Sequence, residues 1–239
     1  MIPADIGIPL EESFMGEDAE LFETVRTRLF TAVIGDVMDT QGLTRQFLPP
    51  SIRGISPDMT VVGRAMPVLE ADCVGDAVAH TGRTDGFGLM FRALDDLAPG
   101  EVYVCTGASP RYALWGGLMS TRARRLGARG AVLGGFHRDT REIVQLGFPV
   151  FSQGPYAQDQ RLRGRVIDFR CTIEFENGAQ VRPGDLVVGD VDGVLTVPRD
   201  HVADILRLAL AKVEGEGKVR RMIDAGEPTA DIFEKTGIM

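Results

Sequence analysis

An arginine and an aspartate stand side by side at positions 138 and 139, just after an apolar run that ends in two glycines. Neighbouring side chains point in different directions on a helix or a strand, so Arg138 and Asp139 are poorly placed to neutralise each other. An arginine can hold an anionic oxygen by a forked hydrogen bond, and a carboxylate can hold a hard divalent cation. The pair therefore predicts a site where a small anion and a metal ion meet.

A pair of glycines, Gly116 and Gly117, lies about twenty residues upstream within an otherwise helical pattern. Each glycine costs about 1 kcal/mol there relative to alanine, so the pair predicts a break followed by a new helix. The first turn of that helix would expose the backbone N–H groups of Gly116, Gly117, Leu118 and Met119, which suit a carboxylate or phosphate. Together with Arg138 and Asp139, this predicts a site for a small 2-oxo acid.

A purely structural interpretation of the same residues stays open. In it, Arg138 caps a carbonyl group and Asp139 is the N-cap of the helix expected over residues 140–146. His137 should point away from Arg138, which favours a surface or core histidine. The other polar candidates also have both a ligand and a structural explanation: His80, Arg83 and Asp85 in a glycine-rich loop, and Asp36 and Asp39 on an expected helix.

The elements that must position these residues alternate in type through the middle of the chain. Strands are expected at residues 60–72, 101–107, 130–135 and 148–154, with helical regions at 89–100, 111–127 and 139–147 between them. This alternation indicates an α/β sheet with crossover connections. Helices are also expected near residues 18–30 and 34–40, a hairpin at Asn177-Gly178, and further strands to residue 198. Asp200 is the expected N-cap of a final helix over 201–225, interrupted near Gly215 and Gly217.

Composition bounds the class of protein. The 239 residues are 44% hydrophobic, with 26 basic and 34 acidic side chains and a net charge of −8, which argues against nucleic acid as a partner. Cys73, Cys105 and Cys171 form no metal-binding or disulfide pattern. With no apolar run of membrane-spanning length and no basic leader region, we expect a cytoplasmic protein without a membrane partner. The expected organisation is an arm at 1–17, one domain at 18–225 and a tail at 226–239.

Several segments together resemble the RraA-like family. They are GGLMSTRARRLGARGAVLGGFHRDTREIVQLGFPVFSQG, PGDLVVGDVDGVLTVP, TAVIGDVMDTQG and KVEGEGKVRRMI, and they span roughly residues 20–225. The family includes 4-hydroxy-4-methyl-2-oxoglutarate aldolases and non-catalytic regulators of ribonuclease activity. The resemblance implies an α/β fold, a three-layer β/β/α sandwich of the swivelling-domain type in a single domain with helical arms. It also implies a homotrimer or homohexamer with active sites at subunit boundaries.

The resemblance also implies roles for individual residues. The backbone of Gly116, Gly117, Leu118 and Met119 would bind the substrate carboxylate, Arg138 its carboxylate and enolate oxygens, and Asp139 a Mg2+ or Mn2+ ion. Glu216 matches an acid that the aldolases offer to the metal from a neighbouring subunit, although Glu214 lies close by and a solvated helix face explains either. Two departures stand out: Gly117 occupies the position of an acid that helps proton transfer, and Gly134-Gly135 stands where Asp-Gly is common.

The expected function is therefore a divalent-metal-dependent lyase that cleaves a carbon–carbon bond of a pyruvate-type 2-oxo acid, by aldol cleavage, oxaloacetate decarboxylation or both. Decarboxylation needs no base on a distal hydroxyl and would tolerate Gly117 better, because loss of a general base costs about 10²- to 10⁴-fold in rate. Two alternatives remain. One is a non-catalytic regulatory or binding protein, which Asp139 disfavours because the resemblance implies that such regulators lack this acid. The other is a lyase or isomerase for another sugar-derived acid.

Overall fold

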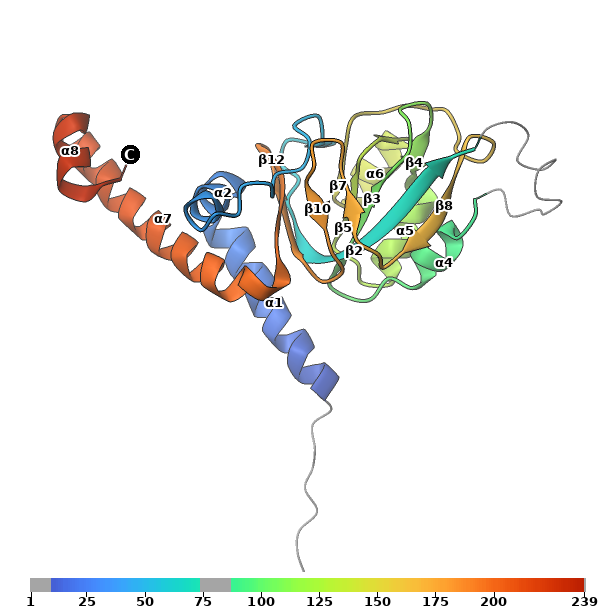
Figure 1. The fold of residues 1–239 in the computed structure, drawn as a ribbon, viewed down its shortest axis with the longest axis horizontal. Coiled ribbons are helices and arrows are strands. Elements are labelled where there is room, and N and C mark those ends of the chain that lie inside the picture. The colour runs from blue at the N-terminus through green and yellow to red at the C-terminus, as the bar shows by residue number, and fades with distance from the viewer. Residues whose placement is uncertain (1–9, 74–86, 239) are drawn as a thin grey trace, which may run out of the picture.

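The computed structural model describes residues 10–73 and 87–238, with side chains from residue 18 onward (Figure 1). The expected loop of His80, Arg83 and Asp85 lies outside these residues. The central element is a sheet of eight strands in the order β1-β7-β5-β3-β2-β11-β12, with β8 also paired to β2. Its strands are β1 (Arg53–Gly54), β2 (Val61–Asp72), β3 (Glu101–Thr106), β5 (Gly130–Leu133), β7 (Val150–Ser152), β8 (Gly164–Phe169), β11 (Leu186–Asp190) and β12 (Gly193–Val197).

The middle of the sheet is parallel and its ends are antiparallel. Strands β2, β3, β5 and β7 run in one direction, whereas β1, β8 and β11 pair antiparallel with their neighbours. Strand β1 contacts β11 and β12, and Arg53 donates a hydrogen bond to the carbonyl oxygen of Asp192 between them. The two ends of the sheet therefore meet, and the sheet nearly closes on itself.

Two apolar cores lie on opposite faces of this sheet. On one face, α4 (Met90–Asp95), α5 (Gly117–Arg125) and α6 (Thr140–Leu146) pack against β2, β3 and β5 around buried Tyr103 and Trp115. On the other face, the hairpin of β9 (Ile173–Glu174) and β10 (Gln180–Val181) buries Phe175 against the sheet. The expected mixed α/β fold and the Asn177-Gly178 hairpin are confirmed.

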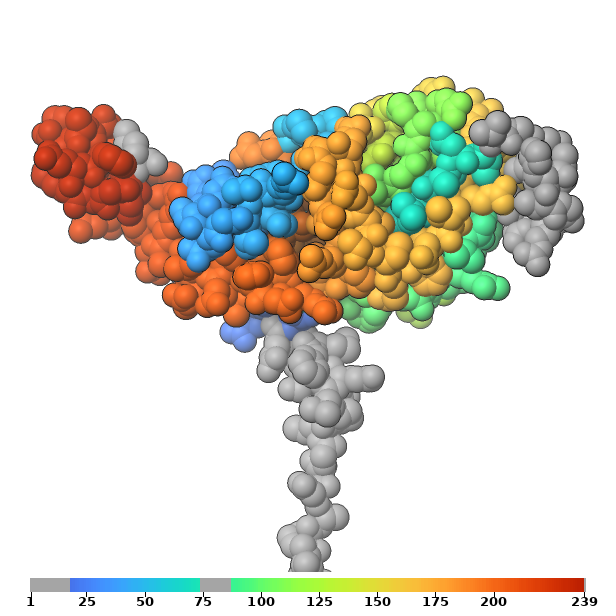
Figure 2. Space-filling view, in the orientation of Figure 1, coloured from blue at the N-terminus to red at the C-terminus, as the bar shows by residue number. Residues whose placement is uncertain are grey.

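A third core covers the β11–β12 end of the sheet. It is built by α1 (Leu10–Arg28), α2 (Thr31–Thr40) and α7 (Val202–Asp224), the last preceded by a short 3-10 helix at Arg199–His201. Figure 1 shows α7 extending away from the body and α8 (Thr229–Thr236) folding back at its far end, and the space-filling view shows the same projecting arm (Figure 2).

Three local expectations are wrong. Residues 113–115 form a strand, β4 (Ala113–Trp115), instead of the first part of a helix, because they pair with β6 (Phe136–His137). Helix α7 continues through Gly215 and Gly217 without interruption, since packing elsewhere along 23 residues offsets their cost of about 1 kcal/mol each. Asp200 does not cap α7; it lies within the preceding 3-10 helix.

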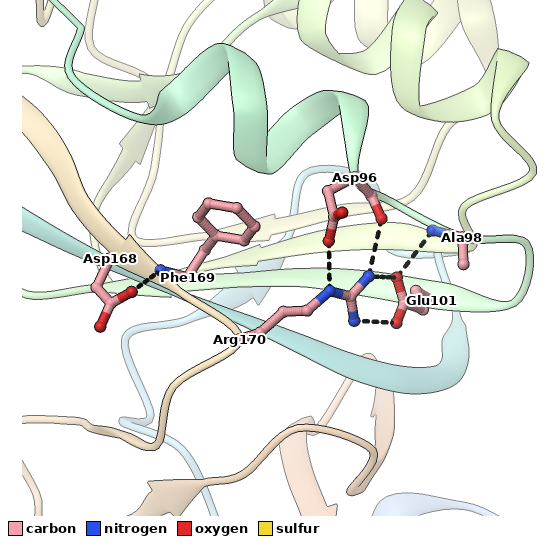
Figure 3. A network of polar contacts seen from close by, with 6 residues as sticks. All are labelled: Asp96, Ala98, Glu101, Asp168, Phe169 and Arg170. Carbon is pink, nitrogen blue, oxygen red and sulfur yellow. Dashed lines mark hydrogen bonds and ion pairs between the residues drawn. The ribbon is translucent and has the colours of Figure 1, made fainter.

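A polar network ties the end of β8 to the start of β3. The guanidinium of Arg170 donates to both carboxylate oxygens of Glu101, at 2.7 and 3.0 Å, and to the carboxylate and carbonyl oxygens of Asp96 (Figure 3). These acids raise the pKa of Arg170 above its ordinary value. Arg170 itself has a positive φ of 54°, a conformation that costs a non-glycine residue about 1 kcal/mol. The network therefore holds the chain in this turn.

Candidate active site

A small parallel sheet brings the two halves of the predicted site together. Strand β4 pairs with β6, so that Trp115 lies opposite His137, and the amide of Arg138 donates to the carbonyl oxygen of Trp115 at 2.9 Å. Gly116 and Arg138 each follow directly after one of these strands. Residues 22 positions apart in the sequence therefore become neighbours because their strands end side by side.

Both strands are anchored by buried side chains. Trp115 is 1% exposed, packs on Tyr103 and Phe148, and donates from Nε1 to the hydroxyl of Ser120 at 2.7 Å. His137 is also 1% exposed, with Nδ1 2.7 Å from the Ser152 hydroxyl and Nε2 2.9 Å from the Thr140 hydroxyl. Burial lowers the pKa of His137. His137 is thus a core histidine, and it fixes the segment that carries Arg138 and Asp139.

Asp139 has the backbone geometry of a functional position. Its φ of 59° and ψ of 35° lie in the left-handed region, which is rare for a residue other than glycine. It stands at the N-cap position of α6, but its side chain makes no capping hydrogen bond there. Instead, Oδ2 accepts a hydrogen bond of 3.0 Å from the amide of Gly117 on α5. The alternative in which Asp139 caps its own helix is therefore wrong.

The amino end of α5 is partly free. Gly116 is the N-cap with an extended backbone, and its carbonyl oxygen accepts from the amide of Ser120 at 3.1 Å. The amide of Gly117 donates to Asp139 in this structure, and its expected role in binding the substrate stays a prediction. Among the residues that the structure describes, the amides of Leu118 and Met119 have no hydrogen-bond acceptor within the chain. Within the same described residues, the amide of the N-cap residue Gly116 has no acceptor either. Three N–H groups and the positive end of a nine-residue helix thus remain for an anion.

Among the described residues, the side chain of Arg138 contacts carboxylates and no carbonyl group. Its Nη1 lies 3.0 Å from Oδ1 of Asp159, and its Nε lies 3.8 Å from Oδ2 of Asp139. Both Arg138 and Asp139 are about 40% exposed, and with Thr140, Pro155, Tyr156 and Ala157 they line an open hollow of about 370 Å³. This corrects the alternative in which Arg138 caps a carbonyl. The guanidinium of Arg138 therefore contacts two carboxylates and still has an exposed part that a ligand can reach.

The structure also shows a carboxylate that the sequence interpretation missed. A β-carbon built on Gly117 would lie 2.2 Å from Oε2 and 2.4 Å from Cδ of Glu142, so this carboxylate covers Gly117 directly. Glu142 lies in the first turn of α6, three residues after Asp139. Side chains three positions apart on a helix lie on the same face, so the spacing of Asp139 and Glu142 in DTRE was the sequence signal that Glu142 lies near the site.

Glu216 lies apart from these residues within one chain. It is on α7, with Oε1 3.9 Å from Nζ of Lys212, and α7 lies at the opposite end of the molecule from α5 and α6 (Figure 1). Lys212 also holds Asp36 at 2.6 Å, so Asp36 serves an ion pair between α2 and α7. The expectation that Glu216 reaches a metal from a neighbouring subunit stays a prediction.

The acidic groups suit a cation that keeps much of its water. In the described part of the chain, no three His, Cys, Asp or Glu side chains come close enough to hold a metal among themselves. Mg2+ is commonly bound through one or two carboxylates, with water filling the remaining positions. A half-exposed Asp139 beside an open hollow fits such an ion, whereas it does not fit a site that needs four protein ligands.

A second hollow of about 400 Å³ lies among Arg45, Gln180, Arg182 and His201. It mixes these groups with the carboxylates of Glu174, Asp185 and Asp200. Asp185 accepts hydrogen bonds from the backbone amides of Arg182 and Arg199, and Glu174 accepts one from the side-chain amide of Gln180. The volumes of the two hollows therefore do not show which one is the site. Arg138, the left-handed Asp139 and its contact with the amino end of α5 favour the hollow of about 370 Å³.

Comparison with known proteins identifies the fold family. The family described as Aldolase/RraA matches residues 31–196. The chain belongs to the RraA-like family. A relative from Halalkalibacterium halodurans, provisionally named a 4-hydroxy-4-methyl-2-oxoglutarate aldolase, is 32% identical over 196 residues, which are 81% of this chain and 85% of that protein. An uncharacterised protein of Methanocaldococcus jannaschii is 35% identical over 51% of this chain, and the match spans only 57% of that relative.

Solved structures support the same RraA-like fold. RraAS2 from Streptomyces coelicolor, described as an unusual member of the RNase ES inhibitor RraA family, superposes with a TM-score of 0.73. The two share 22% identity over 84% of this chain and 97% of that one, a likeness that shows the fold alone. In the described residues, no helix is long and apolar enough to span a membrane.

Proposed function

We propose that this RraA-like protein is a divalent-metal-dependent lyase that cleaves a carbon–carbon bond of a pyruvate-type 2-oxo acid. The observation that carries the proposal is that Arg138 and Asp139 line one hollow, and that Asp139 also contacts the open amino end of α5 through the amide of Gly117. The provisional aldolase names of several relatives point to the same class of reaction.

Different groups of the site would bind different parts of the substrate. The free amides of Leu118 and Met119 would hold the carboxylate of the 2-oxo acid at the positive end of α5. The guanidinium of Arg138 would lie against the oxygen on which negative charge develops when the bond breaks, and so stabilise the enolate. Both groups are held by the β4–β6 pair before substrate arrives, so that little reorganisation is needed.

Asp139 is the proposed ligand of Mg2+ or Mn2+. Such an ion supplies a Lewis acid that polarises the oxygens of a 2-oxo acid. The left-handed backbone of Asp139 and the hydrogen bond from Gly117 together fix where its carboxylate points. A second acid ligand, Glu216, would have to come from another copy of the chain, because α7, which carries it, lies at the other end of the molecule from α5 and α6 (Figure 1). This requires an oligomer, which we propose is a homotrimer or homohexamer, and light scattering on the purified protein would detect it.

The test is a coupled assay for pyruvate over a panel of 2-oxo acids that includes 4-hydroxy-4-methyl-2-oxoglutarate and oxaloacetate. We expect pyruvate release that depends on Mg2+ or Mn2+ and is lost in Arg138→Lys, which keeps the charge and loses the forked geometry. Absence of release from every member of the panel, with the protein folded and metal present, would contradict the lyase and favour a regulatory role on the same fold.

A further inference from the structure

Cleavage of an aldol requires a base that takes the proton from the hydroxyl group next to the breaking bond. Three carboxylates lie next to Arg138 or to the amino end of α5, namely Asp139, Asp159 and Glu142, and two of them already have partners. Asp139 accepts the amide of Gly117, and Asp159 lies 3.0 Å from the guanidinium of Arg138. Glu142 makes no hydrogen bond or ion pair with any residue that the structure describes, so its carboxylate is available for proton transfer.

The position of Glu142 is set by two neighbouring features. Helix α6 starts at Thr140, whose hydroxyl is held by buried His137, so the first turn that carries Glu142 is anchored to the core. The carboxylate reaches across to α5 and lies over Gly117, in the space that any side chain at that position would need. Gly117 therefore leaves room for Glu142, and the two positions are coupled.

We propose that Glu142 is the general base of aldol cleavage in this protein. This inference rests on the proposed lyase function. The carboxylate takes the proton of the substrate hydroxyl, and the electron pair of that O–H bond forms the carbonyl group of one product. The electron pair of the breaking carbon–carbon bond moves onto the pyruvate fragment as its enolate, which Arg138 stabilises. Protonated Glu142 then returns the proton to the enolate carbon, so no oxidant or reductant is needed.

The two reactions of the proposed lyase separate this role from a structural one. Decarboxylation of oxaloacetate forms the same enolate but has no hydroxyl proton to remove. Glu142→Gln keeps the size and polarity of the side chain and removes its basicity. We expect kcat for cleavage of 4-hydroxy-4-methyl-2-oxoglutarate to fall by about 10²- to 10⁴-fold, with KM changed only a few-fold. The rate of oxaloacetate decarboxylation should fall by less than about tenfold.

Two further variants make the test specific. In Glu142→Ala the side chain is removed, so added formate should partly restore cleavage by acting as a replacement base. Glu20→Gln removes an exposed acid on α1, away from the site, and controls for the change in net charge. Parental cleavage by Glu142→Gln, or equal loss of both reactions, overturns the role of Glu142. If the parent protein releases pyruvate from neither substrate, the proposed function fails first and the inference fails with it.

Discussion

Gly116→Ala tests whether the close contact between α5 and Asp139 organises the site. The backbone of Gly116 is extended, with φ −155° and ψ −176°, so alanine introduces no backbone strain. Its β-carbon, however, would lie 2.7 Å from Oδ2 of Asp139, a distance that side chains do not tolerate. The carboxylate must move by several tenths of an ångström, and its 3.0 Å hydrogen bond from Gly117 is lost or lengthened.

The expected loss of stability is modest and the loss of function is large. The hydrogen bond and the poorer N-cap each contribute about 1 kcal/mol, so the free energy of unfolding should fall by about 1 to 2 kcal/mol. A misplaced catalytic group costs about 10²-fold, which we expect in kcat/KM for metal-dependent pyruvate release. Urea denaturation and the coupled assay measure the two effects.

Gly117→Ala is the matched control for stability. Its β-carbon meets only the far end of the flexible Glu142 side chain, which can move aside, and alanine is the better helix former. We therefore expect no loss in the free energy of unfolding. A Gly116→Ala protein with parental kcat/KM would refute the reasoning, because Asp139 would then tolerate displacement.

Three further predictions concern stability. Burial, with a smaller contribution from Asp72, raises the pKa of Glu70 to about 8, so folded Glu70 stays protonated while the unfolded chain loses the proton near its ordinary value of 4.5. The free energy of unfolding should therefore fall with rising pH between 4.5 and 8, by up to about 1.4 kcal/mol per pH unit, and Glu70→Gln should lack this loss. Urea denaturation of both proteins at pH 5 and pH 8 measures the effect. If the parent and the variant differ in stability by the same amount at both pH values, the prediction is contradicted. Arg170→Ala removes the partly exposed ion pairs with Asp96 and Glu101 but keeps a residue with a left-handed backbone. We expect the free energy of unfolding, measured by urea denaturation, to fall by about 1 to 2 kcal/mol at low salt and by less in 1 M salt. A decrease that does not depend on salt would argue against the ion pairs. Within the described residues, Thr196 is the one buried side chain with an unpaired polar atom, so Thr196→Val should raise the melting temperature by about 2 to 4 °C, and a lower melting temperature would show that the hydroxyl has a partner.

The strands and the site segments could be predicted from the sequence because their signals are local. Runs rich in β-branched residues predicted β2 and β3, a short apolar run predicted β5, and the glycine pair marked the start of α5. Strand β4 could not be predicted in this way. Its three residues continue smoothly into a helical pattern, and only pairing with β6, which begins more than twenty residues later, makes them a strand.

It was harder to predict how the residues of the site are arranged than which residues belong to it. Arg138 and Asp139 were expected to act together because of their residue types. The left-handed backbone of Asp139 and its bond to Gly117 depend on how α5 and α6 approach each other, which is a tertiary effect. Glu142 was missed for the same reason, since only the fold places its carboxylate over a glycine of another helix.

The most direct test of the central claim is calorimetry with oxalate, a mimic of the pyruvate enolate, with and without Mg2+. The informative variant is Asp139→Asn, because asparagine tolerates the left-handed backbone and keeps an acceptor for Gly117, so that only the charge is removed. We predict that the parent protein binds oxalate much more tightly when Mg2+ is present, and that Asp139→Asn loses this metal-dependent gain. Equal binding by both proteins, or no effect of metal on the parent, would contradict the assignment of Asp139 and Arg138 to one metal-assisted anion site.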